Sequence, residues 1–432
     1  MDLDVVFQAG VPLRRQLEDS LRVAIRSGRL GPGSLLPPSR DLAQQLGVSR
    51  GVVVGSYAQL AAEGYVAAQR GSGTRVARLP ETGSPLPRIP RPAAQRFRYD
   101  LRPGQADFHA VPRARWKAAL LRALRDLPDN RLSYAGHRGI PELRAAIAGY
   151  LARMRGVVVE PDQVVVCCAA SQALAVIWDV LRRRGVRRVA IEDPGWRWQR
   201  YTAEHAGLEA VPVRVDADGL VVSELAAARV DAVVITPAHQ YPTGMVMTAE
   251  RRSALLAWAH ERQALIIEDD YDVEYRFGRE PVASLQGLAP DRVVFVGTTS
   301  KTLAPALRLA WMLALATFIG DAGLERHLRS MRRRYRVKRE ILVDALHTYL
   351  PEARIGGTAA GLHLLAQLPD GADERAVALR ARAAGVGLHE LHRHCTARAP
   401  FPPALLLGFA LPAEADLPAA ARLLAGAVRA IP

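Results

Sequence analysis

The sequence predicts an α/β protein with two domains: a small N-terminal domain of helices and a β-hairpin, and a larger domain built on a mostly parallel, doubly wound sheet. Two patterns support this prediction. Residues 12–76 contain short helical stretches and one alternating stretch, whereas short β-branched runs alternate with helical stretches after residue 98. Strands that are buried on both faces of a parallel sheet have such near-continuous apolar runs. A chain of 432 residues is also long enough for more than one domain.

Composition narrows the class of protein. Hydrophobic residues make up 49% of the chain, which is typical of soluble globular proteins with a large core. No apolar run is long enough to cross a bilayer and the acidic N-terminus does not resemble a secretory signal, so we expect a cytoplasmic protein. The three cysteines suggest neither a disulfide framework nor a metal site. A formal net charge of +15 favours a polyanionic partner, with nucleic acid first.

Two short helices in residues 37–65 are joined by a very tight turn. Ser39 is a good N-cap for the first of them, Gly47 is a natural stop, and Ser49 caps the second. Such spacing is typical of a helix-turn-helix. The alternating stretch 65–77 turns at Gly-Ser-Gly and predicts a β-hairpin wing. We therefore expect residues 1–76 to form a winged helix-turn-helix domain.

The second short helix is expected to contact DNA. A recognition helix presents its N-terminal residues to base edges in the major groove, where Arg50 is suited to donate to a guanine. Arg40 is placed for a phosphate or groove contact, and Val52 for a thymine methyl group. Arg70 and Arg75 flank the wing glycines, where both could contact DNA phosphates. The residues predicted to bind DNA are Arg40, Ser49, Arg50, Gly51, Val52, Tyr57, Arg70 and Gly73.

Charge and motifs both support this assignment over a solvated helical domain of another purpose. Residues 1–98 contain 14 arginines against seven acidic residues. The stretches "LPPSRDLAQQLGVSR", "SYAQLAAEGY" and "GSGT" resemble the winged-helix domain of the GntR family, which implies binding to double-stranded promoter DNA. Val52 stands where that family often has a threonine. Residues 77–98, which are rich in proline and arginine, are interpreted as a semi-rigid solvated linker rather than a DNA contact.

Polar residues in the larger domain, 99–432, gather where the predicted strands end. Ligands of doubly wound sheets bind at the carboxyl ends of the strands. Asp269 and Tyr271 follow "QALIIE", and Thr298, Ser300 and Lys301 follow "VVFVG". "AHQYPTG" follows "VVITP", "DPGW" follows "RVAIE", and "AASQAL" follows "QVVVCC" and opens a helix.

Lys301 is unusual because the chain has only two other lysines, Lys117 and Lys338. A lysine amine can lose its proton and condense with an aldehyde, whereas a guanidinium stays charged. A carboxylate, an aromatic ring, hydroxyls and a helix start are what an aldehyde cofactor with a pyridine ring and a phosphate needs. Each feature alone has an ordinary explanation as a surface or core residue, but their joint occurrence at strand ends favours a cofactor site.

The order of "YAGHRGIPELRAAIAGYL", "EDPGW", "TPAHQYPTG", "EDDYDVEYRF" and "TTSKTLAPALRL" resembles fold-type I pyridoxal-phosphate aminotransferases, in particular the regulatory branch called MocR. The resemblance implies a Schiff base between pyridoxal 5′-phosphate (PLP) and Lys301. It implies that Asp269 pairs with the pyridine nitrogen and that Tyr271 bonds the ring hydroxyl. The other implied cofactor contacts are Trp196 on the ring, Thr298, Ser300, Arg308, Ser171 and the backbone of Ala170 at the phosphate, Tyr134 across a homodimer, and His239 and Tyr241 near the ring hydroxyl.

The chain departs from this pattern in several places. Ala169 and Ala170 stand where the family commonly has Gly-Ser. The segment "PALLLGFA" (403–410) lacks the arginine that binds the substrate carboxylate in aminotransferases, although Arg393 and Arg398 lie close by in sequence. The segment after Arg308 is shorter than usual. The basic stretch that follows it is interpreted as a solvated helix face rather than a second DNA surface.

Three functions are compatible with these residues. The first is a transcription regulator whose aminotransferase-like domain binds PLP as cofactor or signal. The second is an active aminotransferase that also binds DNA, and the third is a regulator whose second domain is only a dimerisation scaffold. The missing carboxylate-binding arginine disfavours the second, and the retained lysine and aspartate disfavour the third. We therefore predict a regulator with vestigial or no transaminase activity. Its small-molecule effector is either PLP itself or an amine or amino acid, with PLP slightly favoured.

Overall fold

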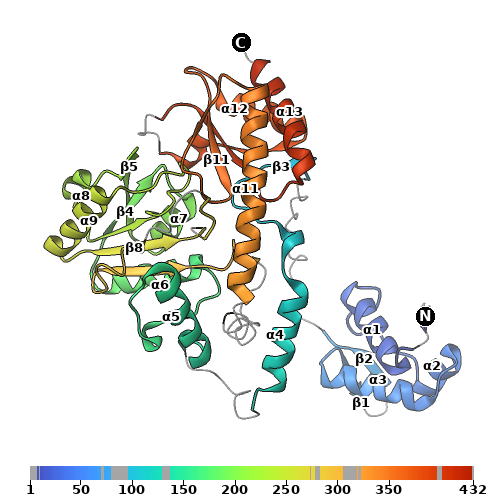
Figure 1. Ribbon diagram of the computed structural model, residues 1–432. Helices are drawn as coiled ribbons and strands as arrows, with labels where there is room; N and C mark the ends of the chain where they lie inside the picture. Colours follow the sequence, from blue (N-terminus) through green and yellow to red (C-terminus); the bar gives the residue numbers. More distant parts are fainter. Residues whose placement is uncertain are drawn as a thin grey trace. The chain divides into compact units, whose positions relative to one another are not determined.

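A computed structural model describes residues 7–8, 10–69, 73–78, 96–128, 137–272, 274–277, 283–304, 319, 323–396 and 401–430. The chain divides into two compact units, residues 1–94 and 95–432, whose elements are labelled in Figure 1. In the predicted linker, only residues 77–78 and 96–98 are described. Within this described part, no helix is long and apolar enough to cross a membrane.

The first unit is a winged helix-turn-helix, as predicted. It consists of α1 (Leu13–Arg26), α2 (Ser39–Leu46), α3 (Arg50–Ala62) and an antiparallel hairpin of β1 (Val66–Gln69) and β2 (Gly73–Val76). Gly47 ends α2 in the left-handed conformation, with φ of 65°. Its backbone N–H bonds the last carbonyls of α2, so the chain can turn directly into α3.

The predicted serine caps are wrong in detail. Pro38 occupies the N-cap position of α2, and Ser39 is the first residue of the helix. Ser49 is the N-cap of α3, but its side chain makes no capping hydrogen bond. The Ser39 hydroxyl instead accepts a long bond of 3.5 Å from Arg50 Nε, so it faces the start of α3.

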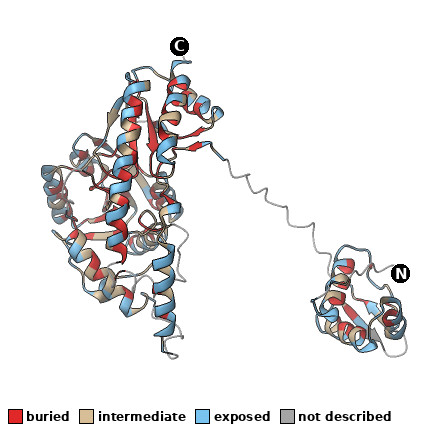
Figure 2. Ribbon diagram, turned by 45° about the vertical axis from the view of Figure 1, so that its right-hand side comes forward, coloured by how far each residue is buried: buried red, intermediate tan, exposed pale blue. Residues whose placement is uncertain are grey.

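Apolar residues on the inner faces of these helices form one core, coloured red in Figure 2. Leu17 and Leu21 of α1 pack with Leu42 of α2 and with Val53 and Leu60 of α3, and all five are fully excluded from solvent. Their spacing is the helical one that the sequence shows. This core fixes the three helices relative to one another.

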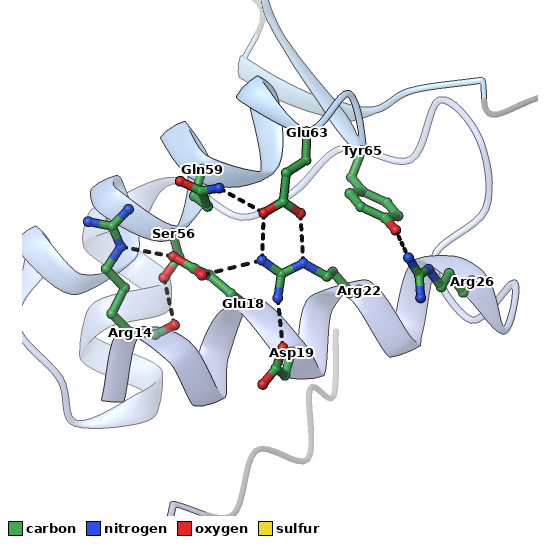
Figure 3. A network of polar contacts seen from close by, with 9 residues as sticks. All are labelled: Arg14, Glu18, Asp19, Arg22, Arg26, Ser56, Gln59, Glu63 and Tyr65. Carbon is green, nitrogen blue, oxygen red and sulfur yellow. Dashed lines mark hydrogen bonds and ion pairs between the residues drawn. The ribbon is translucent and has the colours of Figure 1, made fainter. Parts of the chain in front are cut away.

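A polar network holds the end of α3 against α1 (Figure 3). Arg22 donates from Nε and from one terminal nitrogen to the two carboxylate oxygens of Glu63, at 2.7 Å each, and to Asp19 at 2.7 Å. The bond from Arg22 lowers the pKa of the Glu63 carboxyl to about 2. Arg26 donates to the Tyr65 hydroxyl, just before β1. Recognition helix and wing are therefore both tied to α1.

The second unit contains the predicted doubly wound sheet. Its strand order is β6-β5-β4-β7-β8-β9, and all neighbours are parallel except β6, which is antiparallel to β5. The strands are β4 (Arg188–Asp193), β5 (Glu209–Asp216), β6 (Gly219–Leu220), β7 (Ala232–Ile235), β8 (Leu265–Asp270) and β9 (Val293–Gly297). The helices connected to them are α6 (Ala170–Arg183), α7 (Arg197–His205), α8 (Ser223–Ala228) and α9 (Ala249–Arg262).

Helices cover both faces of this sheet. Val233 of β7 and Ile266 of β8 pack with Leu255 of α9 on one face, whereas Val234 and Ile267 pack with helix α6 on the other. This burial of successive residues explains why the strands are near-continuously apolar. Five of the six apolar runs that the sequence predicts as strands are confirmed. The sixth, "QVVVCCA" (163–169), is not a strand, and it pairs with no strand among the described residues.

The rest of the unit surrounds the long helix α11 (Gly323–Tyr349). An antiparallel sheet with order β10-β11-β14-β13 packs there with α13, and the two-residue strand β3 pairs in parallel with β12. The remaining strands are β3 (Tyr99–Asp100), β10 (Arg354–Gly356), β11 (His363–Gln367), β12 (Val386–Gly387), β13 (His389–Glu390) and β14 (Ala404–Gly408). The remaining helices are α4 (Arg113–Arg125), α5 (Pro141–Arg155), α12 (Glu374–Ala383) and α13 (Leu417–Arg429), with short 3-10 turns η1 (Phe108–Ala110), η3 (Pro161–Gln163), η4 (Leu391–His394) and η5 (Glu414–Asp416).

Candidate functional site

The first candidate site is the exposed start of α3. Arg50 and Gly51 open this helix and Ser49 precedes it, and all three are exposed, while Val52 is half-buried. Arg40 is exposed in the first turn of α2. The bond from Arg50 to Ser39 brings the starts of α2 and α3 together. The structure therefore presents the two arginines on neighbouring helix starts without an acidic partner among the described residues.

Tyr57 does not belong to this exposed surface. It is buried in the core of the unit, and its hydroxyl donates to the Pro37 carbonyl at 2.9 Å. Its role is to hold α3 against the start of α2, as its place on the inner face requires. Gly73 opens β2 with φ of +86°, and a Cβ there would lie 2.9 Å from the Leu35 side chain. Arg70 lies outside the described residues.

We expect Arg50 and Arg40 to differ in what they recognise. Arg50→Ala should relax sequence preference at one or two positions and cost about 1–3 kcal/mol at those positions. Arg40→Ala should weaken binding to all sequences alike and reduce the salt dependence, because it removes a phosphate contact. Binding to a set of single-base variants of a selected site, measured at several salt concentrations, separates the two effects. Uniform weakening by Arg50→Ala would refute this division.

The second candidate site centres on Lys301, just beyond the carboxyl end of β9. Its Nζ donates to the Gly104 carbonyl at 2.8 Å. Burial lowers the pKa of the Lys301 amine, while the nearby carboxylates of Asp272 and Asp269 act in the opposite direction. A lowered pKa increases the fraction of neutral amine, which is the nucleophilic form.

Asp269 lies on the neighbouring strand, near the end of β8. The register pairs it with Val296 of β9, so its carboxylate and the Lys301 turn share one edge of the sheet. Its Oδ2 accepts from Gln199 Nε2 at 2.8 Å, whereas its Oδ1 is buried without a hydrogen-bond partner. Burial raises the pKa of this carboxyl to about 6. An unpaired buried carboxylate oxygen is a site for an additional N–H donor.

Tyr271 and His239 form a second polar pair at the same edge. His239 Nδ1 lies 2.9 Å from Asp272 Oδ1 and 3.1 Å from the Tyr271 hydroxyl, and His239 and Asp272 are both buried. Burial raises the pKa of the Tyr271 hydroxyl, so it stays protonated and available to donate. Tyr241 packs edge-on against Tyr271 with ring centroids 5.9 Å apart. The four side chains form one continuous group, in which His239 and Asp272 are buried and the two tyrosines are half-buried.

Hydroxyls of the turn that precedes Lys301 lie together with a helix start. Thr298 and Ser300 are bonded to each other at 3.0 Å, and both line a cavity of about 750 Å³ that also borders Ala169 and Ala170 at the start of α6. The free N–H groups of a helix start favour an anion such as phosphate. Ser171 follows in the same turn of α6. Arg308 and Tyr134, which were predicted to contact the phosphate, lie outside the described residues.

Trp196 is the N-cap of α7 and is half-buried against the cluster of α6 and β4. Gln199, one turn further along α7, is the residue that donates to Asp269. The strand ends of β4, β7, β8 and β9 thus supply one group of side chains around Lys301, at the position that doubly wound sheets use for ligands.

Two family profiles match the chain. That of the bacterial regulatory proteins of the gntR family covers residues 13–76, and that of aminotransferase class I and II covers residues 100–356. The chain is 34% identical to the HTH-type pyridoxine biosynthesis transcriptional regulator PdxR of Corynebacterium glutamicum, over 81% of this chain and 82% of that protein. It is 33% identical to the probable rhizopine catabolism regulatory protein MocR of Rhizobium meliloti, over 89% and 87%.

The chain belongs to the MocR group of gntR-family regulators. Solved aminotransferases share the fold of the larger domain of this MocR-type chain. The kynurenine aminotransferase of Pyrococcus horikoshii superposes with a TM-score of 0.68 at 22% identity, covering 77% of this chain and 90% of that chain. An archaeal alanine:glyoxylate aminotransferase superposes with a TM-score of 0.66 at 26% identity, covering 77% of this chain and 91% of that chain. The larger domain of the MocR-type chain therefore has a PLP-binding fold.

Three residues of the MocR-type site were not predicted from its sequence. Gln199 donates to Asp269, and Asp272 is bonded to His239. The Gly104 carbonyl accepts from Lys301. Asp272 was detectable, because it directly follows Tyr271 in "EDDYD", at the same strand end. Gly104 was not, since it acts through its backbone and lies 197 positions before the lysine.

Proposed function

We propose that this protein is a DNA-binding transcription regulator whose larger domain holds PLP at Lys301, as a cofactor or as the signal itself. The observation that supports PLP binding best is a half-buried lysine amine, Lys301, at the same sheet edge as the buried carboxylate of Asp269. The lysine has a lowered pKa, and the aspartate has one buried oxygen without a partner. A dimerisation scaffold gains nothing from an unpaired buried carboxylate oxygen, because such a group destabilises the fold.

The described residues fit the chemical groups of PLP. Lys301 Nζ would carry the covalent bond, and the free Oδ1 of Asp269 would accept from the protonated pyridine nitrogen. Tyr271 and His239 would bond the ring hydroxyl, with Tyr241 beside them and Trp196 against the ring. Thr298, Ser300, Ser171 and the backbone of Ala170 would hold the phosphate with Arg308, and Tyr134 would complete it from the second copy of a homodimer; Arg308 and Tyr134 are carried over from the family resemblance and lie outside the described residues.

The surrounding residues prepare this site in the absence of a ligand. The Gly104 carbonyl accepts a hydrogen bond from the lysine amine and fixes the direction of Nζ. Gln199 holds Asp269 by one oxygen and leaves the other free. When bound, PLP would supply an aldehyde that accepts amines and a cationic ring that withdraws electrons. Amines that reach the site would then be sensed through this aldehyde.

A titration with PLP tests the proposal. Purified protein should develop a visible absorption band that saturates at one equivalent per chain and survives gel filtration. Protein that gives no band, or only one that is lost on desalting, would favour the scaffold function.

We expect Asp269→Asn to weaken PLP binding by about 1.5–3 kcal/mol, the range for a hydrogen bond to a charged group. The substitution keeps the size of the side chain but removes the negative charge that stabilises a pyridinium. PLP affinity and the position of the absorption band are the measurements. Asp231→Asn, at an exposed position before β7, is the matched control. If Asp269→Asn has the parent's affinity and spectrum, another residue holds the ring nitrogen.

We also expect negligible transamination of common α-amino acids. Transaminases position the Cα–H bond of the substrate through a guanidinium on its carboxylate. In this chain the corresponding strand, β14, presents Leu405, Leu406 and Leu407, all fully buried. Glutamate formation from 2-oxoglutarate, PLP and a panel of amino acids, measured against Lys301→Ala, checks this. Turnover many times above that variant would establish the alternative function, an aminotransferase with a fused DNA-binding domain.

A further inference from the structure

Three histidines of the C-terminal part of the chain lie against the Tyr241 side of the cofactor site. His363 begins β11, His389 lies in β13, and His394 ends η4. The ring of Tyr241 lies 5.5 Å from that of His363 and 5.2 Å from that of His394, between ring centroids. The rings of His389 and His394 are 5.9 Å apart. We call His363, His389 and His394 the imidazole cluster.

Hydrogen bonding in the imidazole cluster is incomplete. His394 is 5% exposed, and neither of its ring nitrogens has a partner. His389 Nδ1 is also buried without a partner. His363 makes one long contact, 3.3 Å from Nε2 to the Pro242 carbonyl. Buried polar groups in folded proteins are almost always bonded, so several unpaired nitrogens in one place indicate a binding position.

The charges around the cluster favour an anion. The groups with the largest effect on His394 are all basic: His389, Arg393, His363 and Arg197. Among the charged groups with the largest effect on His389, Arg393, Arg382 and Arg102 outnumber one acid, Glu390, which is bonded to Arg382. The ring of His363 lies 5.4 Å from that of His239, and the charges that act on His363 are those of His239, Asp272 and Lys301. Arg393 is exposed and forms no ion pair with the acidic side chains that the structure describes.

The histidines themselves are neutral without a ligand. Burial lowers the pKa of His363 and of His389 to about 4, and that of His394 to about 3. An anion among them would raise these pKa values, because an opposite charge favours the protonated form. Its binding would then be accompanied by proton uptake. A metal ion is a poorer fit, since the described residues contain no group of three side chains arranged to hold one.

We infer that the imidazole cluster binds the carboxylate of a small effector whose amine lies toward Lys301. This inference rests on the proposed function, since it places the effector at the same site. His363 connects the two ends, because its ring lies 5.4 Å from that of His239, and His239 Nδ1 lies 2.9 Å from Asp272, a carboxylate close enough to act on the Lys301 amine. The cluster takes over the task of the arginine that β14 lacks. The effector class is therefore an amine with a carboxylate, rather than PLP alone.

The test compares amines that differ only by the carboxylate, with PLP-loaded protein. Glycine is matched with methylamine and β-alanine with ethylamine, and each dissociation constant is taken from the change in visible absorbance. Each constant is corrected for the fraction of neutral amine at that pH, because the two amines of a pair differ in pKa. We expect the carboxylated member of at least one pair to bind tighter. Because its binding takes up protons, this advantage should fall as the pH rises, by up to about tenfold per pH unit for each proton.

Variants assign the advantage to the cluster. His394→Phe should remove it, His394→Asn should retain part of it but lose the pH dependence, and His347→Phe, an exposed histidine of α11, should leave it unchanged. Thermal unfolding shows whether each variant is folded. If His394→Phe is not folded, the affinities of His394→Asn test the inference. Equal affinities within both pairs, or an advantage that His394→Phe and His394→Asn retain in full, would overturn the inference. In those cases PLP would still be bound at Lys301, whereas failure of the proposed function would appear as protein without bound PLP.

Discussion

Lys301→Ala should abolish covalent capture of PLP. Borohydride reduction of the wild type with PLP, followed by peptide mapping, should place the label on Lys301 at one equivalent per chain. The variant should carry none. The reason is that Lys301 is a half-buried amine whose pKa burial lowers, held by the Gly104 carbonyl at the edge of the sheet that also carries Asp269. An arginine-rich chain with three lysines offers few other amines.

The two other lysines provide internal controls for this experiment. Lys117 is exposed on α4, so Lys117→Ala should leave labelling unchanged. Lys338 is 1% exposed and donates to Asp107 and to the Ala410 carbonyl, so its amine is not accessible to an aldehyde. Label on either residue in place of Lys301 would show that the cofactor site lies elsewhere.

Asp107→Ala should destabilise the larger domain by about 3–5 kcal/mol, the range for breaking a buried ion pair. Asp107 Oδ2 accepts from Lys338 Nζ at 3.1 Å and from Arg334 Nε at 2.8 Å, and the side chains of Asp107 and Lys338 are 2% and 1% exposed. Burial by itself raises the pKa of the Asp107 carboxyl, but the bond from Lys338 and the charges of Lys338 and Arg334 more than offset it. Its removal leaves the Lys338 ammonium buried without a counter-charge.

Urea unfolding of the variant measures this loss. The double variant Asp107→Ala with Lys338→Met should recover most of it, because it leaves no unpaired buried ion, and Arg334, which also loses its partner, is 46% exposed to water. The depressed pKa of Asp107 also predicts that its stabilisation is present above the ordinary pKa of an aspartate and is lost as the pH falls through the folded value. An unfolding free energy within about 1 kcal/mol of the wild type would show that the pair does not hold the domain together.

Much of this fold was predictable because its signals are local. Five apolar runs gave five strands of the sheet, and the positions of Asp269, Thr298 and Lys301 followed from the rule that parallel strands carry ligands at their carboxyl ends. The stretch 163–169 is as apolar as these five runs but is not a strand. An apolar run alone does not determine whether a neighbouring strand is present to pair with it. Likewise, Pro38 rather than Ser39 occupies the N-cap of α2, because the helix already begins at Ser39, one residue earlier than predicted.

The parts of the site that the sequence did not predict depend on contacts between distant segments. Gly104 meets Lys301 only because β3 is held beside β12, and His394 meets Tyr241 only after the C-terminal sheet has folded against the larger one. The sequence pointed to Arg393 and Arg398 as replacements for the missing arginine. The structure shows Arg393 exposed, places the imidazole cluster inside, and does not describe Arg398.

The central claim is that DNA binding responds to a ligand at Lys301. Double-stranded DNA selected from a random pool by the full-length protein provides a site whose affinity can be measured without PLP, with PLP, and with PLP plus β-alanine. We predict that at least one addition changes the affinity of the wild type by about 5- to 150-fold, the usual range of coupling between two sites, and that Lys301→Ala shows no change. Affinities that are the same under all three conditions, or that change equally in Lys301→Ala, would contradict the account.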